Sequence, residues 1–111
     1  MHSTELVKGT LQTIILKLLA DNDTMYGYEI TQKVKELSDG KMVLTEGALY
    51  PTLHKMEAEG LLTTEKKSFG KRVRKYYSLT ATGKSSVVEK VQEFEAFINT
   101  MFNVLQISPQ L

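Results

Sequence analysis

The sequence predicts a mainly α-helical fold with a small β-hairpin, ending in one long helix. Three observations carry this prediction. Apolar residues recur at helical spacing through most of the 111 residues, and strand-like alternation replaces that spacing only around residues 62–79. Near the C-terminus the helical spacing returns as a heptad pattern. A chain of this length suits one compact domain and leaves little room for a second.

Two amphipathic helices are predicted before residue 40, over residues 4–20 and 26–38. Acidic and amide residues separate them, and Thr24 or Asn22 is the expected N-cap of the second helix. The apolar run at residues 42–44 is too short for a helix and is expected to form a small edge strand. The expected buried faces are Val7, Leu11, Ile14, Ile15, Leu18 and Leu19 in the first helix, and Ile30, Val34 and Leu37 in the second.

The third predicted helix, residues 46–59, has two faces of different character. Thr45 is its expected N-cap and Gly60 ends it. Pro51 lacks a backbone donor and is expected to kink the helix unless its first turn is loose. The buried face comprises Leu49, Leu53 and Met56, whereas the opposite face is free of acidic groups and comprises Gly47, Tyr50, Pro51, His54 and Ala58, with Lys55 at its edge.

A β-hairpin is predicted from two runs rich in β-branched and aromatic residues, 62–67 and 73–79. Residues 68–71 form the expected turn, where Gly70 is free to adopt a positive φ. Alternation places Lys75, Tyr77 and Leu79 on one face of the second strand and Arg74, Tyr76 and Ser78 on the other.

Positive charge is concentrated in this hairpin. The whole chain carries a formal charge of only +1, and its pI of about 7.9 lies below the value of about 9 that is usual for nucleic-acid-binding domains. Any basic surface must therefore be local. Six of the 14 basic residues lie within ten positions, namely Lys66, Lys67, Lys71, Arg72, Arg74 and Lys75. A solvated surface hairpin is the alternative interpretation of this cluster.

The last predicted helix covers residues 80–106, with Thr80 as its N-cap. Its apolar positions follow one another at spacings of four and three, which is the seam of a coiled coil. The pattern predicts pairing with a second copy of the chain, and packing on the chain's own domain is the alternative. The seam comprises Val87, Val91, Phe94, Ile98, Met101 and Leu105.

Composition excludes several kinds of chemistry. The chain has no cysteine, which excludes disulfides, thiolate metal sites and a cysteine nucleophile. With His2 and His54 as its two histidines and no glycine-rich phosphate loop, we expect neither an enzyme nor a metal or other cofactor. No apolar stretch approaches the roughly 20 residues of a membrane span, and no signal peptide is evident, so we expect a cytoplasmic protein without a membrane partner.

Three helices followed by a two-stranded hairpin are the order of a winged helix-turn-helix. Residues 1–79 would form a DNA-binding domain of this fold, and residues 80–111 a dimerisation helix. The third helix would enter the major groove, which is about 12 Å wide, and the basic wing would neutralise phosphates. We expect Lys55, Lys66 and Lys67 to contact phosphates and Arg72 to enter a minor groove. The candidate DNA-binding residues are Thr45, Gly47, Tyr50, Pro51, His54, Lys55, Lys66, Lys67, Lys71, Arg72, Arg74 and Lys75.

Two of these candidates have an alternative role. Tyr50 would touch a phosphate or a base edge, or it would pack on the neighbouring turn. His54 would donate to DNA, or it would simply be exposed to solvent. An alternative also exists for the whole module, because the same fold serves as a protein–protein interaction module without DNA binding. Such a module has no need of six basic residues in its wing, so we favour the DNA-binding hypothesis.

Three separated motifs resemble the PadR family of bacterial transcriptional regulators. Residues 47–61 resemble its third helix, residues 74–83 its second wing strand and the start of its last helix, and residues 26–30 the start of its second helix. The resemblance covers about residues 5–85, and the single C-terminal helix resembles the small type of member. It implies a homodimeric repressor that binds a palindromic operator and pairs through its last helix, with help from the first.

The resemblance also implies release from DNA by a small-molecule effector. Some small members bind flat aromatic molecules in the dimer pore through a tryptophan of the last helix. This chain has no tryptophan. A small aromatic effector would depend on Phe94, Phe97 and Phe102 to line its pocket, although phenylalanines at helical spacing more often pack in a core.

Overall fold

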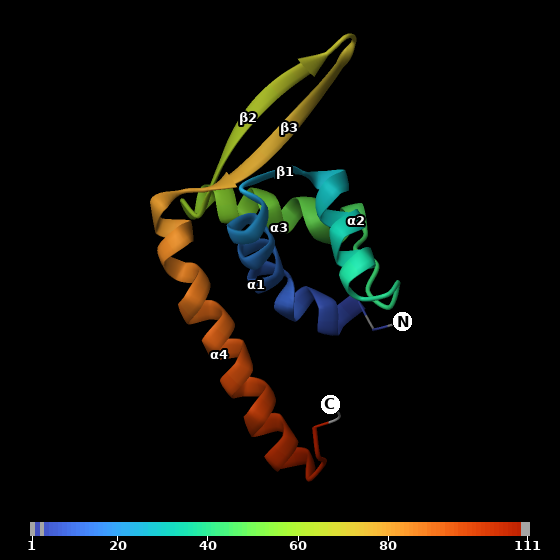
Figure 1. Cartoon of the computed structure of the whole chain (residues 1–111), viewed down its shortest axis with the longest axis vertical. Coiled ribbons are helices and arrows are strands. Elements are labelled where there is room, and N and C mark those ends of the chain that lie inside the picture. Colours follow the sequence, from blue (N-terminus) through green and yellow to red (C-terminus); the bar gives the residue numbers. More distant parts are fainter. Residues whose placement is uncertain (1, 3, 110–111) are drawn as a thin grey trace.

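This computed structural model describes residue 2 and residues 4–109 of the chain. Within this part the chain forms four helices and a three-stranded antiparallel sheet (Figure 1). The predicted fold class is confirmed. The sheet has the order β1-β3-β2, so the strand nearest the N-terminus lies at one edge. The elements are α1 (Thr4–Asn22), β1 (Thr24–Tyr26), α2 (Gly27–Leu37), α3 (Glu46–Ala58), β2 (Leu62–Phe69), β3 (Arg72–Leu79) and α4 (Ala81–Leu105).

The core is built around α1. Its side chains pack with the buried faces of α2 and α3 and with Tyr77 of β3, which is 1% exposed. Three positions differ from the expected pattern, and one of them, Ile14, is only half-buried at the edge of the core. Leu16 is fully buried because α1 is covered on more than one side, and Leu37 is exposed because it lies in the last turn of α2. The fully buried side chains are Leu11, Ile15, Leu16, Leu19, Ile30, Leu49, Leu53, Met56 and Tyr77.

The third strand of the sheet lies at a place that the sequence did not predict. Residues 42–44 form no strand, because Leu44 is buried within a loop and the backbone N–H of Met42 donates to the Ser38 hydroxyl, 3.0 Å away. Instead β1 pairs with β3 in the chain segment just before α2. The N-cap of α2 is therefore Tyr26, not Thr24 or Asn22, and its backbone N–H donates to the Glu29 carboxylate.

Helix α3 begins as expected and continues without a break through Pro51. The Thr45 hydroxyl accepts from the backbone N–H of Ala48, 3.2 Å away, and so caps the helix. Pro51 is exposed, and its missing donor falls opposite the carbonyl of Gly47, an exposed residue of the first turn. Because that carbonyl can be solvated, the helix tolerates the proline.

The hairpin of β2 and β3 forms a wing that projects away from the helices (Figure 1). Its strands are longer than predicted, since Phe69 pairs with Arg72 and leaves only Gly70 and Lys71 in the turn. Gly70 has a φ of 60°, which suits the first residue of a two-residue hairpin turn. Eight residues per strand span about 26 Å at the usual rise.

The start of α4 is fixed to the end of α3 through Thr80. The Thr80 hydroxyl accepts from the backbone N–H of Gly83 and donates to the carbonyl of Gly60, 2.6 Å away. The backbone N–H of Thr80 donates to the carbonyl of Leu61. The wing, the third helix and the last helix therefore meet at one joint.

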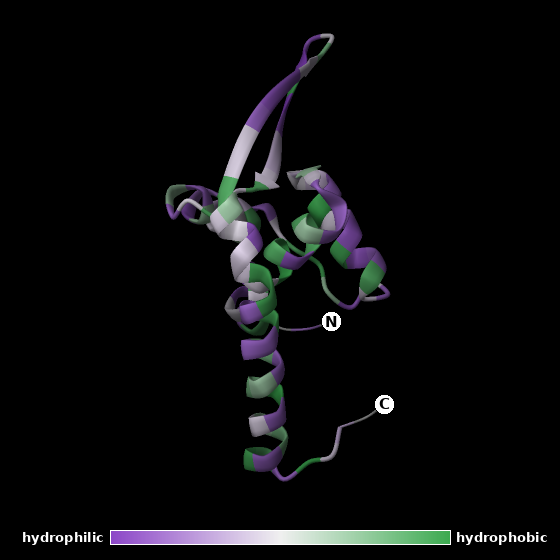
Figure 2. Cartoon of the chain, turned by 60° about the vertical axis from the view of Figure 1, so that its left-hand side comes forward, coloured by the Kyte–Doolittle hydropathy of each residue, from purple (hydrophilic) through white to green (hydrophobic). Residues whose placement is uncertain are grey.

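Helix α4 is the longest helix of the described residues and extends beyond the other three. Its 25 residues span about 37 Å, and it packs first along α1 and then extends past the other helices (Figures 1 and 2). Figure 2 shows hydrophobic segments along α4 as far as its lower end. None of the helices in the described residues is both long enough and apolar enough to span a membrane.

Candidate nucleic-acid interface

A hollow of about 380 Å³ joins the exposed face of α3 to the base of the wing. Tyr50 and His54 line it from α3, and Arg74 and Lys75 line it from β3. The start of α2 closes its third side. The two surfaces that the sequence assigned to DNA are thus neighbours, although some 20 residues separate them along the chain.

The face of α3 beside this hollow is mostly exposed. Gly47, Pro51, His54 and Lys55 are exposed, and Thr45 lies exposed at the head of the helix. The buried side of the same helix holds Leu49, Leu53 and Met56 in the core, as predicted. The helix therefore has one face that anchors it and one that is accessible from solvent.

Tyr50 is half-buried and packs against the first residue of α2. A Cβ atom built on Gly27 would overlap the Tyr50 hydroxyl and lie 2.8 Å from the ring carbon Cζ. The ring also contacts the hydrophobic core. Gly27 is therefore needed for the close approach of α2 to α3, and it sets the position of the Tyr50 side chain.

The Gly27→Ala variant is expected to displace the Tyr50 ring and to lower the free energy of unfolding by about 1–2 kcal/mol, the usual cost of overpacking. Urea unfolding of four proteins measures this effect: the wild type, Gly27→Ala, Tyr50→Ala and the double variant. In the Tyr50→Ala background the extra methyl meets no ring, so its cost should largely vanish. An equal cost in both backgrounds would show that another contact opposes the methyl group.

The basic side chains of the wing fall into two groups. Lys66, Lys67, Lys71 and Arg72 are exposed, whereas Arg74 and Lys75 are half-buried. Among the residues that the structure describes, the side chains of Lys66, Lys71 and Arg72 form no ion pair, hydrogen bond or ring contact. These three cations are available to a partner.

The other cations of the wing already have partners within the chain. Arg74 lies over two rings, with its guanidinium carbon 4.5 Å from the centre of Tyr26 and 5.0 Å from that of Phe69. Lys67 lies 4.8 Å from the centre of the Tyr76 ring. Cation–π contacts of this length are favourable even at exposed sites.

Lys75 forms an ion pair with the third helix. Its ammonium lies 3.3 Å from Oε1 of Glu57, and the Thr64 hydroxyl donates to Oε2 of the same carboxylate at 3.0 Å. The hydrogen bond from Thr64, followed by the hydrogen bond and charge of Lys75, lowers the pKa of Glu57 below its usual value. These contacts therefore stabilise the fold above the ordinary pKa of a glutamate, and protonation removes that stabilisation as the pH falls through the lowered pKa.

A comparison with known families assigns the chain. The model of the transcriptional regulator PadR-like family matches residues 15–89, more than half of the sequence. The chain belongs to the PadR-like family of transcriptional regulators. Its members are regulators and not enzymes, as the sequence led us to expect.

Individual members of the PadR-like family agree with this assignment. A transcriptional regulator of Mycobacterium tuberculosis is 35% identical over 91 residues, which cover 82% of this chain and 81% of that protein. The structure of a transcriptional regulator from Clostridium thermocellum matches with a TM-score of 0.82 and 27% identity, over 93% of this chain and 97% of that one. The structure of Bacillus subtilis PadR in complex with operator DNA matches with a TM-score of 0.66 and 30% identity, over 73% of this chain and 46% of that one.

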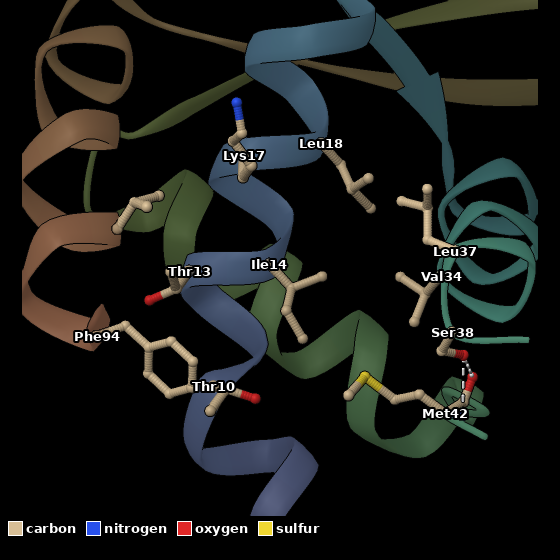
Figure 3. A pocket seen from close by; sticks show the side chains of 11 residues that line it. Thr10, Thr13, Ile14, Lys17, Leu18, Val34, Leu37, Ser38, Met42 and Phe94 are labelled. Atoms are coloured by element: carbon tan, nitrogen blue, oxygen red, sulfur yellow. Dashed lines mark hydrogen bonds between the residues drawn. The ribbon is translucent and has the colours of Figure 1, made fainter. Parts of the chain in front are cut away.

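Phe94 of the last helix lines two hollows in this PadR-family chain. The first, of about 370 Å³, lies between α1, α2 and α4 and is mostly apolar; Figure 3 shows Phe94 on one side, Ile14 on α1 and Val34 with Leu37 opposite. The second, of about 560 Å³, lies between α1 and α4 and is lined by Phe94 and Phe97. Phe94 and Phe97 thus face open space beside the helix, and Phe102 is half-buried further along it.

Several residues of this PadR-family interface were not found from the sequence. Tyr26 and Phe69 contact Arg74, Glu57 forms the ion pair with Lys75, and Thr64 donates a hydrogen bond to the Glu57 carboxylate. The pairing of β1 with β3, the pairing of β2 with β3 and the packing of α3 on β2 bring these partners together. No local sequence pattern marks such contacts.

Proposed function

We propose that this PadR-family chain is a sequence-specific DNA-binding regulator. In this proposal it is a homodimeric repressor in the cytoplasm, which a small molecule releases from a palindromic operator. The observation that supports the DNA-binding part is the hollow between α3 and the base of the wing, because it makes the acid-free face of α3 and the basic wing neighbours. The unpaired cations Lys66, Lys71 and Arg72 lie further out on the same wing. The operator complex of Bacillus subtilis PadR, a relative with the same fold, supports it.

The proposed mode of binding follows from the two surfaces. The exposed face of α3 would lie in the major groove, where Gly47 allows close approach and His54 and Tyr50 reach phosphate or base edges, with Pro51 and the helix head at Thr45 beside the backbone. Lys55, Lys66 and Lys71 would contact phosphates, and Arg72 at the wing tip would enter the minor groove. In this arrangement residues 1–79 bind DNA and residues 80–111 pair the subunits.

Salt dependence of binding tests the DNA-binding proposal. The probes are the duplex upstream of the chain's own gene and a duplex of random sequence, titrated at several salt concentrations. With about 3–4 phosphates neutralised per subunit, the logarithm of the binding constant should fall with that of the salt concentration at a slope of about −6. Absence of binding, or a slope near zero on both duplexes, would favour a protein–protein interaction module instead.

The proposed dimer rests on the heptad seam of α4. Along this seam, exposure increases away from the body: Val87 is 8% exposed, the middle residues Val91, Phe94, Ile98 and Met101 are half-buried, and Leu105 is 55% exposed. Phe97 and Val104 add apolar surface that the chain itself does not cover. A second copy related by twofold symmetry would cover this surface in the usual way of isologous dimers.

An Ile98→Asp variant tests this pairing. A twofold interface would receive two carboxylates, so the dissociation constant of the dimer should rise by at least about 100-fold. Sedimentation at low micromolar concentration should then give the mass of a single chain, against twice that mass for the wild type. Asn99→Asp adds the same charge at the adjacent exposed residue and should leave the dimer intact. A wild-type protein that sediments as one chain would remove the dimer from the proposal.

The proposed effector is a small aromatic molecule that binds beside α4. Phe94 supports this choice because it lines both hollows, and the larger one has a volume typical of ligand sites. Planar aromatic compounds should therefore release the wild-type protein from its own upstream duplex in a competition assay. The Phe94→Ala variant should need about 2–10-fold more compound, as expected when one aromatic contact is lost. Equal response of both proteins would place the effector elsewhere.

A further inference from the structure

Two adjacent basic side chains of the wing point to opposite faces of β3, and the chain itself holds both. The Arg74 guanidinium lies over the ring of Tyr26, and the Lys75 ammonium pairs with the carboxylate of Glu57. Both basic side chains are half-buried. They differ in this respect from Lys71 and Arg72 at the tip, which are exposed.

Besides rings of the wing itself, these two side chains contact one residue at the start of α2 and one residue of α3. Tyr26 is the last residue of β1 and the N-cap of α2, and its ring also packs edge-on against Tyr76 at a centroid distance of 5.4 Å. Glu57 lies in the last turn of α3. Arg74 therefore links the wing to the start of α2, and Lys75 links it to the end of α3.

The contacts lie just where the sheet loses its third strand. Pairing of β1 with β3 ends at the pair Tyr26–Tyr76, and beyond it the wing is a bare two-stranded hairpin. Lys75 and Arg74 are the first two residues of β3 past that point. An isolated two-stranded hairpin is marginally stable and twists freely, so contacts here determine the direction of the whole tip.

The position of the tip depends strongly on this direction. Four residues separate Lys75 from Lys71, about 13 Å along a strand. A swing of about 10° at Lys75 would displace the tip by about 2 Å, which exceeds the range of about 0.5 Å in hydrogen-bond lengths. The free cations of the tip reach a fixed set of phosphates only if this angle is held.

We propose that Arg74 and Lys75 are positioning residues, which brace the wing against α2 and α3 and do not serve as phosphate ligands. This inference rests on the proposed DNA-binding function and divides the basic residues of the wing by role. Lys66, Lys71 and Arg72 deliver charge to the duplex. Arg74 and Lys75 set the angle at which that charge is presented.

The slope of affinity against salt distinguishes the two roles. Lys71→Met should reduce the magnitude of the slope by about 2 in a dimer, because each subunit loses one phosphate contact. Lys75→Met makes the same chemical change four residues away, and Arg74→Met is its counterpart on the other face. Both should weaken binding about 5–10-fold at fixed salt while the slope stays that of the wild type. A slope that falls as it does for Lys71→Met overturns the proposal.

Hydrogen–deuterium exchange of the free protein tests the brace without DNA. Amides of β2 and β3 should exchange faster in Arg74→Met and Lys75→Met than in the wild type, and at the wild-type rate in Lys71→Met. Exchanging the charges, as Glu57→Lys with Lys75→Glu, should restore protection that either single variant loses. Unchanged exchange in the Met variants, or no recovery in the double variant, overturns the brace. If the wild-type protein binds neither duplex, the proposed DNA-binding function is wrong. The exchange measurements need no DNA, so they still test whether Arg74 and Lys75 hold the wing in place.

Discussion

Replacing Lys66, Lys71 and Arg72 together with alanine is expected to lower the affinity for duplex DNA by about 10²–10⁴-fold at physiological salt. These three exposed side chains have no partner within the described residues, so each is free to displace a counterion from a phosphate. A dimer would lose up to six such contacts. The slope against salt should become correspondingly shallow, and titration of both duplexes at several salt concentrations measures it.

A second triple variant controls for net charge. Lys8, Lys35 and Lys41 are exposed on α1, at the end of α2 and in the loop that follows, all outside the surface formed by α3 and the wing. Changing them to alanine removes the same three charges. Its affinity should stay within about threefold of the wild type, because charge distant from the duplex is screened within a Debye length of about 8–10 Å. Equal losses in both variants would mean that net charge drives binding, and not the wing.

Gly83→Ala is expected to lower the free energy of unfolding by about 3 kcal/mol, at the upper end of ordinary overpacking. A Cβ atom at this position would overlap the backbone carbonyl oxygen of Leu61 and lie 3.2 Å from Cδ2 of Leu79. That carbonyl accepts from Thr80 in the joint between α3 and α4, so it is fixed and cannot rotate away as a side chain would. For a domain of this size the melting temperature should drop by roughly 15 °C.

Gly47→Ala is the matched control for this substitution. Gly47 also lies in the first turn of a helix, but nothing lies within 4 Å of the added methyl group. Alanine favours helix there, so the variant should be as stable as the wild type or more stable by about 0.5–1 kcal/mol. Thermal unfolding of both variants at one protein concentration makes the comparison. If Gly83→Ala has the same melting temperature as Gly47→Ala, the prediction is wrong and the close contact between Gly83 and Leu61 is not needed for the start of α4.

The helices of this fold were predictable because their periodicity and their caps are local. Thr45 and Thr80 accept from the backbone three residues on, as their positions before the apolar runs indicated. Strand β1 was not predictable, since three residues give no period and its pairing is with a strand some 50 residues later. That same pairing made Tyr26 the cap of α2 and overrode the preference for Thr24 or Asn22.

The positive charge of the candidate site was predictable from the sequence, but which of its basic side chains are free and which are paired within the chain was not. Counting basic residues located the wing, and alternation placed Tyr77 and Leu79 on one face of the second strand, where the structure buries both of them. Whether a given lysine or arginine is free depends on residues such as Glu57, which lies 18 positions before Lys75 and meets it only after α3 has packed on the sheet. The contributions of the individual site residues to DNA binding stay predictions.

The overhanging end of α4 would make the lone chain short-lived in a cell. Its last turn carries Val104 and Leu105, both mostly exposed to solvent, and a helix end with so little packing opens often. Degradation follows the population of open forms, and assembly would withdraw the segment from proteases. Unassembled chains would thus be degraded while assembled ones persist. Turnover would then keep the concentration of the regulator close to the concentration at which two chains associate.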